Sequence, residues 1–256
     1  MDTTLDGKVA IVTGGARGIG RVYAQGLAAA SAAVLVADVL EQEGRDTVKS
    51  IEAGGGRAVF HATDVADPDS TEAMAATAAS DLGGIDILVN NAAMFASLQG
   101  GAFTDISVDR WDRTMAVNVK GAWLCMRAVV PHMRARGGGA IVNRSTIAAF
   151  GLAGMLDYAA SKAALIGLTK NAALELGRDR IRVNAIAPGG VATEATAAIL
   201  GGDVSVMQER AQANQLIPEV ILPEDLVGPM LYLVSDASKF MTGQTLVFDG
   251  GRFFLG

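Results

Sequence analysis

Short apolar runs alternate with longer amphipathic segments along the chain. The first run, residues 8–13, is rich in β-branched residues and is followed by glycine, which is typical of a buried strand. The amphipathic segments are long enough to form helices. The pattern therefore predicts seven strands, at residues 8–13, 33–37, 57–62, 85–89, 140–143, 181–186 and 244–248, and six helices, at residues 18–30, 41–53, 70–82, 108–136, 155–177 and 224–235.

The predicted strands are apolar on both of their faces. Strands of this kind occur in parallel sheets that helices cover on both sides. No Pro- or Ser-rich linker divides the chain, so we expect one α/β domain over residues 1–256, built on a doubly wound, seven-stranded parallel sheet. Residues 191–223 lack a clean period. Long irregular segments inside compact domains are usually functional lids or disordered segments, and we expect a substrate lid here.

Composition excludes several kinds of partner. The 27 acidic and 21 basic residues leave a net charge of −6, which argues against nucleic acid. One cysteine cannot form an internal disulfide, and His61 and His132 are too far apart in sequence to suggest a metal site. The longest apolar stretch is well short of the ~18–20 residues that span a bilayer, and the acidic N-terminus has no signal-peptide pattern. We therefore expect a cytoplasmic protein with no metal and no membrane partner.

A glycine-rich turn joins the first predicted strand to the first predicted helix. Gly14, Gly18 and Gly20 let the backbone turn tightly and approach a phosphate, and the N–H groups at the start of the helix favour an anion. Asp38 ends the next strand, where a carboxylate can accept hydrogen bonds from ribose hydroxyls and repel a 2′-phosphate, which favours NAD over NADP. Two observations leave alternatives open: Asp38 could simply cap the following helix, and the basic Arg17 could attract a phosphate.

Tyr158 and Lys162 are four residues apart on a predicted helix and therefore share one face. A free tyrosine has a pKa of about 10, which is too high for an efficient base at neutral pH. A nearby ammonium group favours the phenolate, so the pair indicates proton transfer by Tyr158. The ordinary alternative is a solvated tyrosine and lysine on an amphipathic helix.

Together with Asn90-Asn91-Ala92-Ala93 and Tyr158-Ala159-Ala160-Ser161-Lys162, the turn at residues 13–20 resembles the short-chain dehydrogenase/reductase family. The resemblance covers essentially the whole chain and extends to Asp249-Gly250-Gly251. It implies a Rossmann-type fold and hydride transfer between a nicotinamide cofactor and a secondary alcohol or ketone. It also implies a homo-oligomer, a tetramer in related enzymes, for which the Ala-rich helix at residues 155–177 could provide a packing surface.

The resemblance also assigns roles to individual residues. Tyr158 would be the general acid/base, Lys162 would tune it and hold the nicotinamide ribose, and Asn118 would disturb a long helix and support a proton relay. Ala93 stands where the family usually has glycine, which puts the backbone approach to the cofactor in doubt. The residues implied to contact the cofactor are Gly14, Arg17, Gly18, Ile19, Gly20, Asp38, Asp64, Val65, Asn91, Tyr158, Lys162, Pro188, Gly189, Val191 and Thr193.

The hydroxyl that holds the substrate oxygen has two candidates. The family often has Asn-x-Ser-Ser at this strand end, with the second serine active, and this chain has Asn143-Arg144-Ser145-Thr146. Counting from Asn143 indicates Thr146, whereas counting back from Tyr158 indicates Ser145, and we expect Ser145. Asp157, next to the tyrosine, either faces the pocket or is solvated, and the sequence does not decide between the two.

The sequence therefore predicts an NAD-dependent oxidoreductase of a small-molecule secondary alcohol or ketone, without identifying the substrate or direction. One alternative is a non-catalytic NAD(H)-binding sensor or scaffold on the same fold, and another is an NADP-dependent 3-oxoacyl or carbonyl reductase. An epimerase or dehydratase of nucleotide sugars is disfavoured, because few residues follow Pro188 to build a sugar-nucleotide domain.

Overall fold

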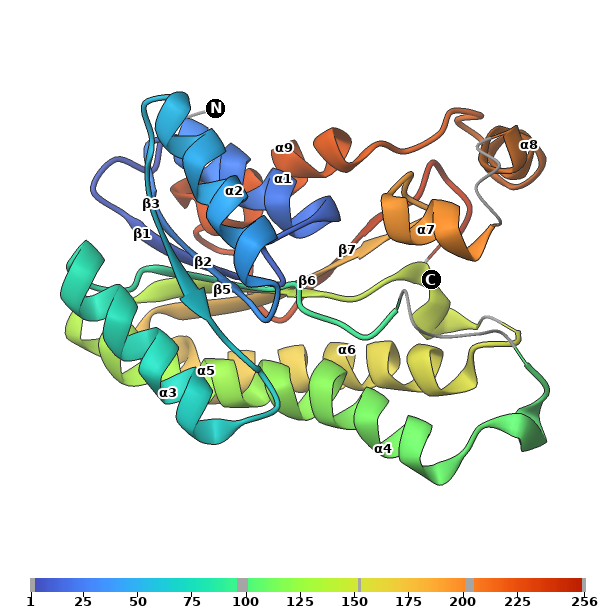
Figure 1. Ribbon diagram of the computed structural model, residues 1–256, viewed down its shortest axis with the longest axis horizontal. Helices are drawn as coiled ribbons and strands as arrows, with labels where there is room; N and C mark the ends of the chain where they lie inside the picture. The colour runs from blue at the N-terminus through green and yellow to red at the C-terminus, as the bar shows by residue number, and fades with distance from the viewer. Residues whose placement is uncertain (1–2, 96–100, 152, 201–204, 255–256) are drawn as a thin grey trace.

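Parallel strands form one sheet in the order β3-β2-β1-β4-β5-β6-β7 (Figure 1). The computed structural model describes residues 3–95, 101–151, 153–200 and 205–254. Its strands consist largely of buried β-branched and aliphatic residues, as the apolar runs predict. Within the described residues the strands are β1 (Val9–Thr13), β2 (Ala33–Asp38), β3 (Arg57–Ala62), β4 (Ile87–Asn90), β5 (Gly139–Arg144), β6 (Ile181–Pro188) and β7 (Thr245–Phe248).

Helices cover both faces of the sheet, so the expected α/β fold of Rossmann type is confirmed (Figure 1). Helices α1, α2 and α9 lie on one face, and α3, α4, α5 and α6 lie on the other. A separate apolar core fills the space on each side. The helices are α1 (Gly18–Ala29), α2 (Glu41–Ala53), α3 (Pro68–Thr77), α4 (Val108–Met115), α5 (Gly121–Ala135), α6 (Leu156–Leu176), α7 (Glu194–Ile199), α8 (Ser205–Asn214) and α9 (Val227–Val234).

The strand order reverses at β1, which pairs with β2 on one side and β4 on the other. In a doubly wound sheet, the connections on either side of such a switch point leave a crevice at the carboxyl ends of the strands. The glycine-rich turn after β1 and the residues that follow β4, β5 and β6 all lie at this edge. The topology therefore gathers most of the predicted site residues.

The largest differences between the predicted and the observed elements are in two segments. The single helix expected at residues 108–136 is interrupted by a π-helical turn, Ala116–Lys120, between α4 and α5. The segment expected to be irregular, residues 191–223, contains α7 and α8. These helices show no apolar period because they bury little: α7 has no buried residue, and α8 buries Met207 and Ala211. Residues 201–204 of this segment lie outside the described residues.

No helix within the described ranges combines the length and the apolar character that crossing a bilayer requires.

Candidate active site

The glycine-rich turn is packed too tightly for side chains at its key positions. Gly14 and Gly18 have positive φ angles of 63° and 53°, a region that favours glycine. A Cβ atom at Gly20 would lie 1.9 Å from the Gly14 carbonyl oxygen. The turn therefore brings bare backbone to the start of α1, where free N–H groups can receive a phosphate.

Asn91 fastens the end of β4 to this turn. Its Nδ2 donates to the carbonyl oxygens of Thr13, at 3.0 Å, and Gly14, at 2.9 Å, and its Oδ1 is buried without a partner. The Thr13 hydroxyl in turn accepts hydrogen bonds from the backbone N–H groups of Asn91 and Ala92. Ala93 replaces the family's usual glycine, so a positive φ there would strain the backbone. It is not among the described non-glycine residues with positive φ.

Asp38 ends β2 beside the same turn. Its Oδ2 accepts from the Ala16 N–H at 3.0 Å, and its Oδ1 accepts from the Leu40 N–H at 3.1 Å. The carboxylate therefore holds the turn and the start of α2 together while remaining only half-buried. Arg17 is exposed and makes no side-chain cap for α1.

Asp64 and Val65 follow β3 at the same edge. Asp64 is exposed and accepts from the Ala66 N–H at 2.9 Å, whereas Val65 is buried against Gly121 at the start of α5. Both residues thus lie near the crevice, but the contacts described here do not show whether they bind a ligand.

Tyr158 and Lys162 are both buried on α6. The Lys162 side chain is 1% exposed, and its Nζ lies 5.7 Å from the centre of the Tyr158 ring. Nζ donates a 2.8 Å hydrogen bond to the Arg144 carbonyl oxygen at the end of β5. Phe95 packs on the Tyr158 ring at a centroid distance of 5.1 Å, so this pair is not a solvated feature of a helix surface.

Asn118 lies in the π-helical turn and connects it to α6. Its Oδ1 accepts from the Met94 N–H at 2.8 Å, and its Nδ2 donates to the Ser161 hydroxyl at 2.9 Å. Ser161 donates to the Tyr158 carbonyl oxygen at 2.7 Å. The expected disturbance of the long helix thus coincides with a hydrogen-bonded connection to the backbone of the tyrosine.

The two candidate hydroxyls have different surroundings. Ser145 is 0% exposed, and its Oγ donates to the Lys162 carbonyl oxygen at 2.8 Å. Thr146 is half-buried, and its Oγ1 donates to the Pro188 carbonyl oxygen at 3.2 Å. The Ala148 N–H donates to the same Oγ1, and Ala148 packs with Tyr158. The Ser145 hydroxyl is thus fully buried and bonded to the backbone of α6, whereas the less buried Thr146 hydroxyl is bonded to the end of β6.

The turn after β6 completes this edge. Pro188 ends the strand, and the Gly189 N–H donates to Phe248 of β7 at 2.9 Å. Val191 forms an isolated parallel bridge with Ile221, and the Thr193 hydroxyl caps α7. A Cβ at Gly18 would lie 3.9 Å from Thr193 Cγ2, so this turn meets the glycine-rich turn across the crevice.

A family model described as Enoyl-(Acyl carrier protein) reductase matches residues 14–252. The chain belongs to the short-chain dehydrogenase/reductase family. It is 43% identical over 247 residues to an uncharacterized oxidoreductase of Mycobacterium tuberculosis, covering 96% of this chain and 98% of that protein. It is 42% identical over 254 residues to trans-4-hydroxycyclohexanecarboxylate dehydrogenase of Sinomonas cyclohexanicum, covering 96% and 92%.

A solved structure supports the same family at the level of the fold. A 7α-hydroxysteroid dehydrogenase complexed with NADH and 7-oxo glycochenodeoxycholic acid superposes with a TM-score of 0.92 at 34% identity, covering 98% of this chain and 96% of that one. A short-chain dehydrogenase/reductase is an oxidoreductase, so the expected enzyme class is confirmed.

Asp157 is neither free in the pocket nor solvated in this short-chain dehydrogenase/reductase. It is 0% exposed, and Arg110 of α4 donates hydrogen bonds to both of its carboxylate oxygens, from Nε to Oδ2 at 2.8 Å and from Nη2 to Oδ1 at 2.9 Å. Thr114 donates to Oδ2 at 3.2 Å. Although burial raises the pKa of Asp157, these hydrogen bonds hold it below its ordinary value. The ion pair fastens α4 to α6 immediately before Tyr158.

Arg144 is the site residue that sequence reasoning missed. The sequence shows it only as the variable position between Asn143 and Ser145, yet its Nη2 donates to the Asn91 carbonyl oxygen at 3.1 Å, and its own carbonyl oxygen accepts from Lys162 Nζ at 2.8 Å. An arginine at the carboxyl end of a buried strand was the available signal, because a charge there requires a partner or a ligand.

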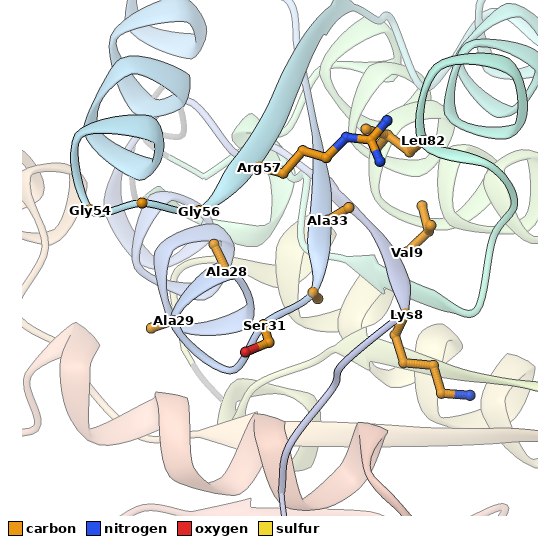
Figure 2. Close-up of a pocket in the computed structure, with 13 residues that line it drawn as sticks. Lys8, Val9, Ala28, Ala29, Ser31, Ala33, Gly54, Gly56, Arg57 and Leu82 are labelled. Carbon is orange, nitrogen blue, oxygen red and sulfur yellow. The ribbon is translucent and has the colours of Figure 1, made fainter.

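A second hollow lies away from this site. It has a volume of about 500 Å³ and is lined by residues at the amino ends of β1, β2 and β3, among them Lys8, Ser31 and Arg57 (Figure 2). None of the predicted site residues lines it. Within the described parts of the chain, no three His, Cys, Asp or Glu residues gather as a metal site would require.

Proposed function

We propose that this chain is an NAD-dependent dehydrogenase or reductase that acts on a secondary alcohol or its ketone. The observation that carries the proposal is the enclosed pair Tyr158 and Lys162, which lies at the same sheet edge as the glycine-rich turn and Thr146. Relatives named as dehydrogenases of a hydroxycyclohexanecarboxylate, of galactose and of a hydroxysteroid support a cyclic hydroxylated substrate.

The residues present fit a dinucleotide cofactor. Gly20 leaves no room for a Cβ, the Asp38 carboxylate lies next to the turn, and Asn91 keeps an unpartnered, buried Oδ1. The cofactor, when bound, supplies the hydride acceptor or donor. The other residues proposed to hold it are those that the family resemblance implies: Gly14, Arg17, Gly18, Ile19, Asp64, Val65, Tyr158, Lys162, Pro188, Gly189, Val191 and Thr193.

Proton transfer is the task of the chain itself. In the oxidation direction, the Tyr158 phenolate takes the hydroxyl proton of the alcohol as the hydride leaves the same carbon. Lys162 would hold the nicotinamide ribose. Asn118 supports the backbone around the tyrosine through Ser161. We assign the substrate oxygen to Thr146 rather than to the expected Ser145, because Ser145 is fully buried with its hydroxyl on the Lys162 carbonyl, whereas Thr146 is half-buried.

The preference for NAD rests on Asp38, whose carboxylate would repel a 2′-phosphate. The solved relatives include one complexed with NADH and one with bound NADP, so the choice needs a direct test. We expect a panel of cyclic and acyclic secondary alcohols and ketones, followed by NADH or NADPH absorbance, to give higher kcat/KM with NAD(H). Equal or better turnover with NADP(H) would overturn the assignment of Asp38. Cofactor binding without turnover of any member would favour the sensor alternative.

Alanine variants separate the two hydroxyls. Thr146→Ala should lower kcat by roughly 10–100-fold, because a hydrogen bond to a developing oxyanion is worth about 1.5–3 kcal/mol. Thr146→Ser keeps a hydroxyl and should retain most of the activity. Ser145→Ala should instead lower the free energy of unfolding by about 0.5–1.5 kcal/mol, because it removes the buried hydrogen bond from Ser145 Oγ to the Lys162 carbonyl oxygen. Loss of kcat in Ser145→Ala with full activity in Thr146→Ala would show that the substrate oxygen binds Ser145.

We further propose that residues 191–223 act as the substrate lid, that the protein works in the cytoplasm and that it assembles as a homo-oligomer, as a tetramer by family resemblance. Exposed apolar side chains support assembly: Trp123 on α5, Leu174 on α6 and Phe240 before β7. Sedimentation equilibrium measures the state, and a monomer at micromolar concentration would contradict the assembly.

A further inference from the structure

Three side chains at four-residue spacing connect α4 and the π-helical turn to α6. Arg110 and Thr114 of α4 both donate to Asp157, and Asn118 donates to Ser161, four residues farther along α6. Both helices advance by four residues between the last two connections, so they lie side by side and run in the same direction (Figure 1). All of these residues except Arg110 are buried, which encloses the row of polar contacts between the two helices.

The first turn of α6 carries Tyr158 but lacks a capping side chain. Met155 occupies the position before the helix, and its side chain makes no hydrogen bond to the turn. Helix ends without such a cap fray more easily, because their first N–H groups lack partners. Asp157 lies in the same turn, next to the tyrosine, and is held by Arg110 through hydrogen bonds of 2.8 and 2.9 Å. The ion pair therefore fixes the turn that carries the tyrosine.

The geometry and burial of this ion pair make it hard to replace. A planar guanidinium matches a carboxylate with two hydrogen bonds, as Arg110 does here. The Asp157 side chain is 0% exposed and that of Arg110 is 22% exposed, so salt screens the pair little. Without Arg110 the buried carboxylate would keep its charge uncompensated, which is strongly unfavourable. Asp157 would then take up a proton or draw its turn toward water.

We propose that Arg110 is a positioning residue for proton transfer: through Asp157 it holds the first turn of α6, so that the Tyr158 oxygen stays within reach of the substrate oxygen. Arg110 acts through Asp157 rather than on the substrate. This assignment rests on the proposed function. Proton transfer depends steeply on placement, and a displacement of about 1 Å can lower a rate by about 10²-fold.

The first test is the kinetics of Arg110→Met, which keeps an unbranched side chain and removes its charge. At a temperature well below the Tm of the variant, we expect kcat to fall by roughly 10–100-fold. The dissociation constant of NADH, measured by calorimetry, should change much less, because the glycine-rich turn lies on other elements. Arg110→Lys keeps the charge without the paired hydrogen bonds and should recover part of kcat.

A double variant distinguishes positioning from a general loss of structure. Asp157→Asn keeps the size of the side chain, removes the charge that Arg110 balances and still offers an oxygen to the Thr114 hydroxyl. Combined with Arg110→Met, it should therefore recover part of the kcat that Arg110→Met loses. A double variant no more active than Arg110→Met would contradict the role of the uncompensated carboxylate.

Arg134→Met is the matched control. Arg134 of α5 donates to Asp179 at 2.7 Å, so this pair also connects the long helix to the α6 region, across 45 residues of chain. It lies beyond the far end of α6 from Tyr158, and the Arg134 side chain is 54% exposed. Because exposed ion pairs contribute little, Arg134→Met should leave kcat and NADH binding unchanged.

Hydrogen exchange followed by mass spectrometry tests the same inference without turnover. In the cofactor-free protein, backbone N–H groups of residues 156–162 should exchange faster in Arg110→Met than in the parent or in Arg134→Met. If Arg110→Met does not fold, as judged by circular dichroism, Arg110→Lys takes its place in every measurement. If no alcohol or ketone is turned over, the proposed function fails, and the exchange result alone decides whether Arg110 holds this turn.

Two results would overturn the positioning role. One is a folded Arg110→Met enzyme whose Tm falls while its kcat stays at the parent value, because the ion pair would then serve stability alone. The other is unchanged exchange at residues 156–162, because the turn would then be held without Arg110.

Discussion

Replacing Tyr158 with phenylalanine should lower kcat by about 10²–10⁴-fold, the usual contribution of a positioned general acid or base. Phenylalanine keeps the ring that packs on Phe95 at 5.1 Å and removes only the oxygen that moves the proton. We therefore expect the affinity for NADH to fall by much less than kcat. Steady-state NADH absorbance gives kcat, and isothermal calorimetry gives the dissociation constant.

Tyr232→Phe is the matched control for this prediction. Tyr232 belongs to α9 and packs against the core on the far side of the sheet from α6, so the same loss of a hydroxyl should leave kcat unchanged. A Tyr158→Phe enzyme with normal kcat would remove the tyrosine from the mechanism. A loss of NADH binding as large as the loss of kcat would instead assign Tyr158 mainly to binding the cofactor.

Replacing Gly20 with alanine should destabilise the protein and abolish NADH binding. The added Cβ would lie 1.9 Å from the Gly14 carbonyl oxygen and 2.5 Å from Asn91 Nδ2. One of these is backbone and the other is held by two hydrogen bonds, so the turn itself must move. Overpacking typically costs 1–3 kcal/mol, which corresponds to a fall in Tm of roughly 2–12 °C for a domain of about this size. Thermal unfolding and calorimetry measure the two effects.

Gly177→Ala is the control, because Gly177 is exposed, has helical backbone angles and has no atom within 4 Å of an added Cβ. This variant should be neutral or more stable by up to about 1 kcal/mol, because alanine has the higher helix propensity. Wild-type affinity for NADH in a folded Gly20→Ala protein would show that the glycine-rich turn does not hold the cofactor.

The sheet could be predicted from the sequence because its strands are buried on both faces. The residues of β1 are buried at every position and apolar in all but the last, Thr13, as expected in a parallel sheet that helices cover on both sides. Helices α7 and α8 could not be predicted in the same way. These two helices bury few side chains, so their sequences lack the apolar period that would mark a face turned toward the core.

In the candidate site, the sequence could not predict contacts between residues that are far apart along the chain. The motifs predicted that Tyr158 and Lys162 share a face, but the partner of Asp157 is Arg110, which lies 47 residues earlier. The choice between Ser145 and Thr146 likewise depends on which of the two hydroxyls is bonded to the backbone of α6. That hydroxyl is Ser145, and the spacing of the motifs does not predict this hydrogen bond. Arg144 escaped notice because a strand-end arginine is identified as part of a site only when its neighbours from β4 and α6 are known.

The purely parallel sheet also governs how the enzyme can be made. No neighbouring strands can form as a hairpin, since parallel pairs require a crossover connection. The two halves of the sheet join only when β4 reaches β1, a contact in which the Val9 N–H meets the Asp86 carboxylate across 77 residues. Until this loop closes, the apolar edges of β1 and β4 remain open to other chains. We therefore expect folding to be slow. When the protein is overproduced, we expect aggregation through these open edges to compete with the pairing of β1 and β4.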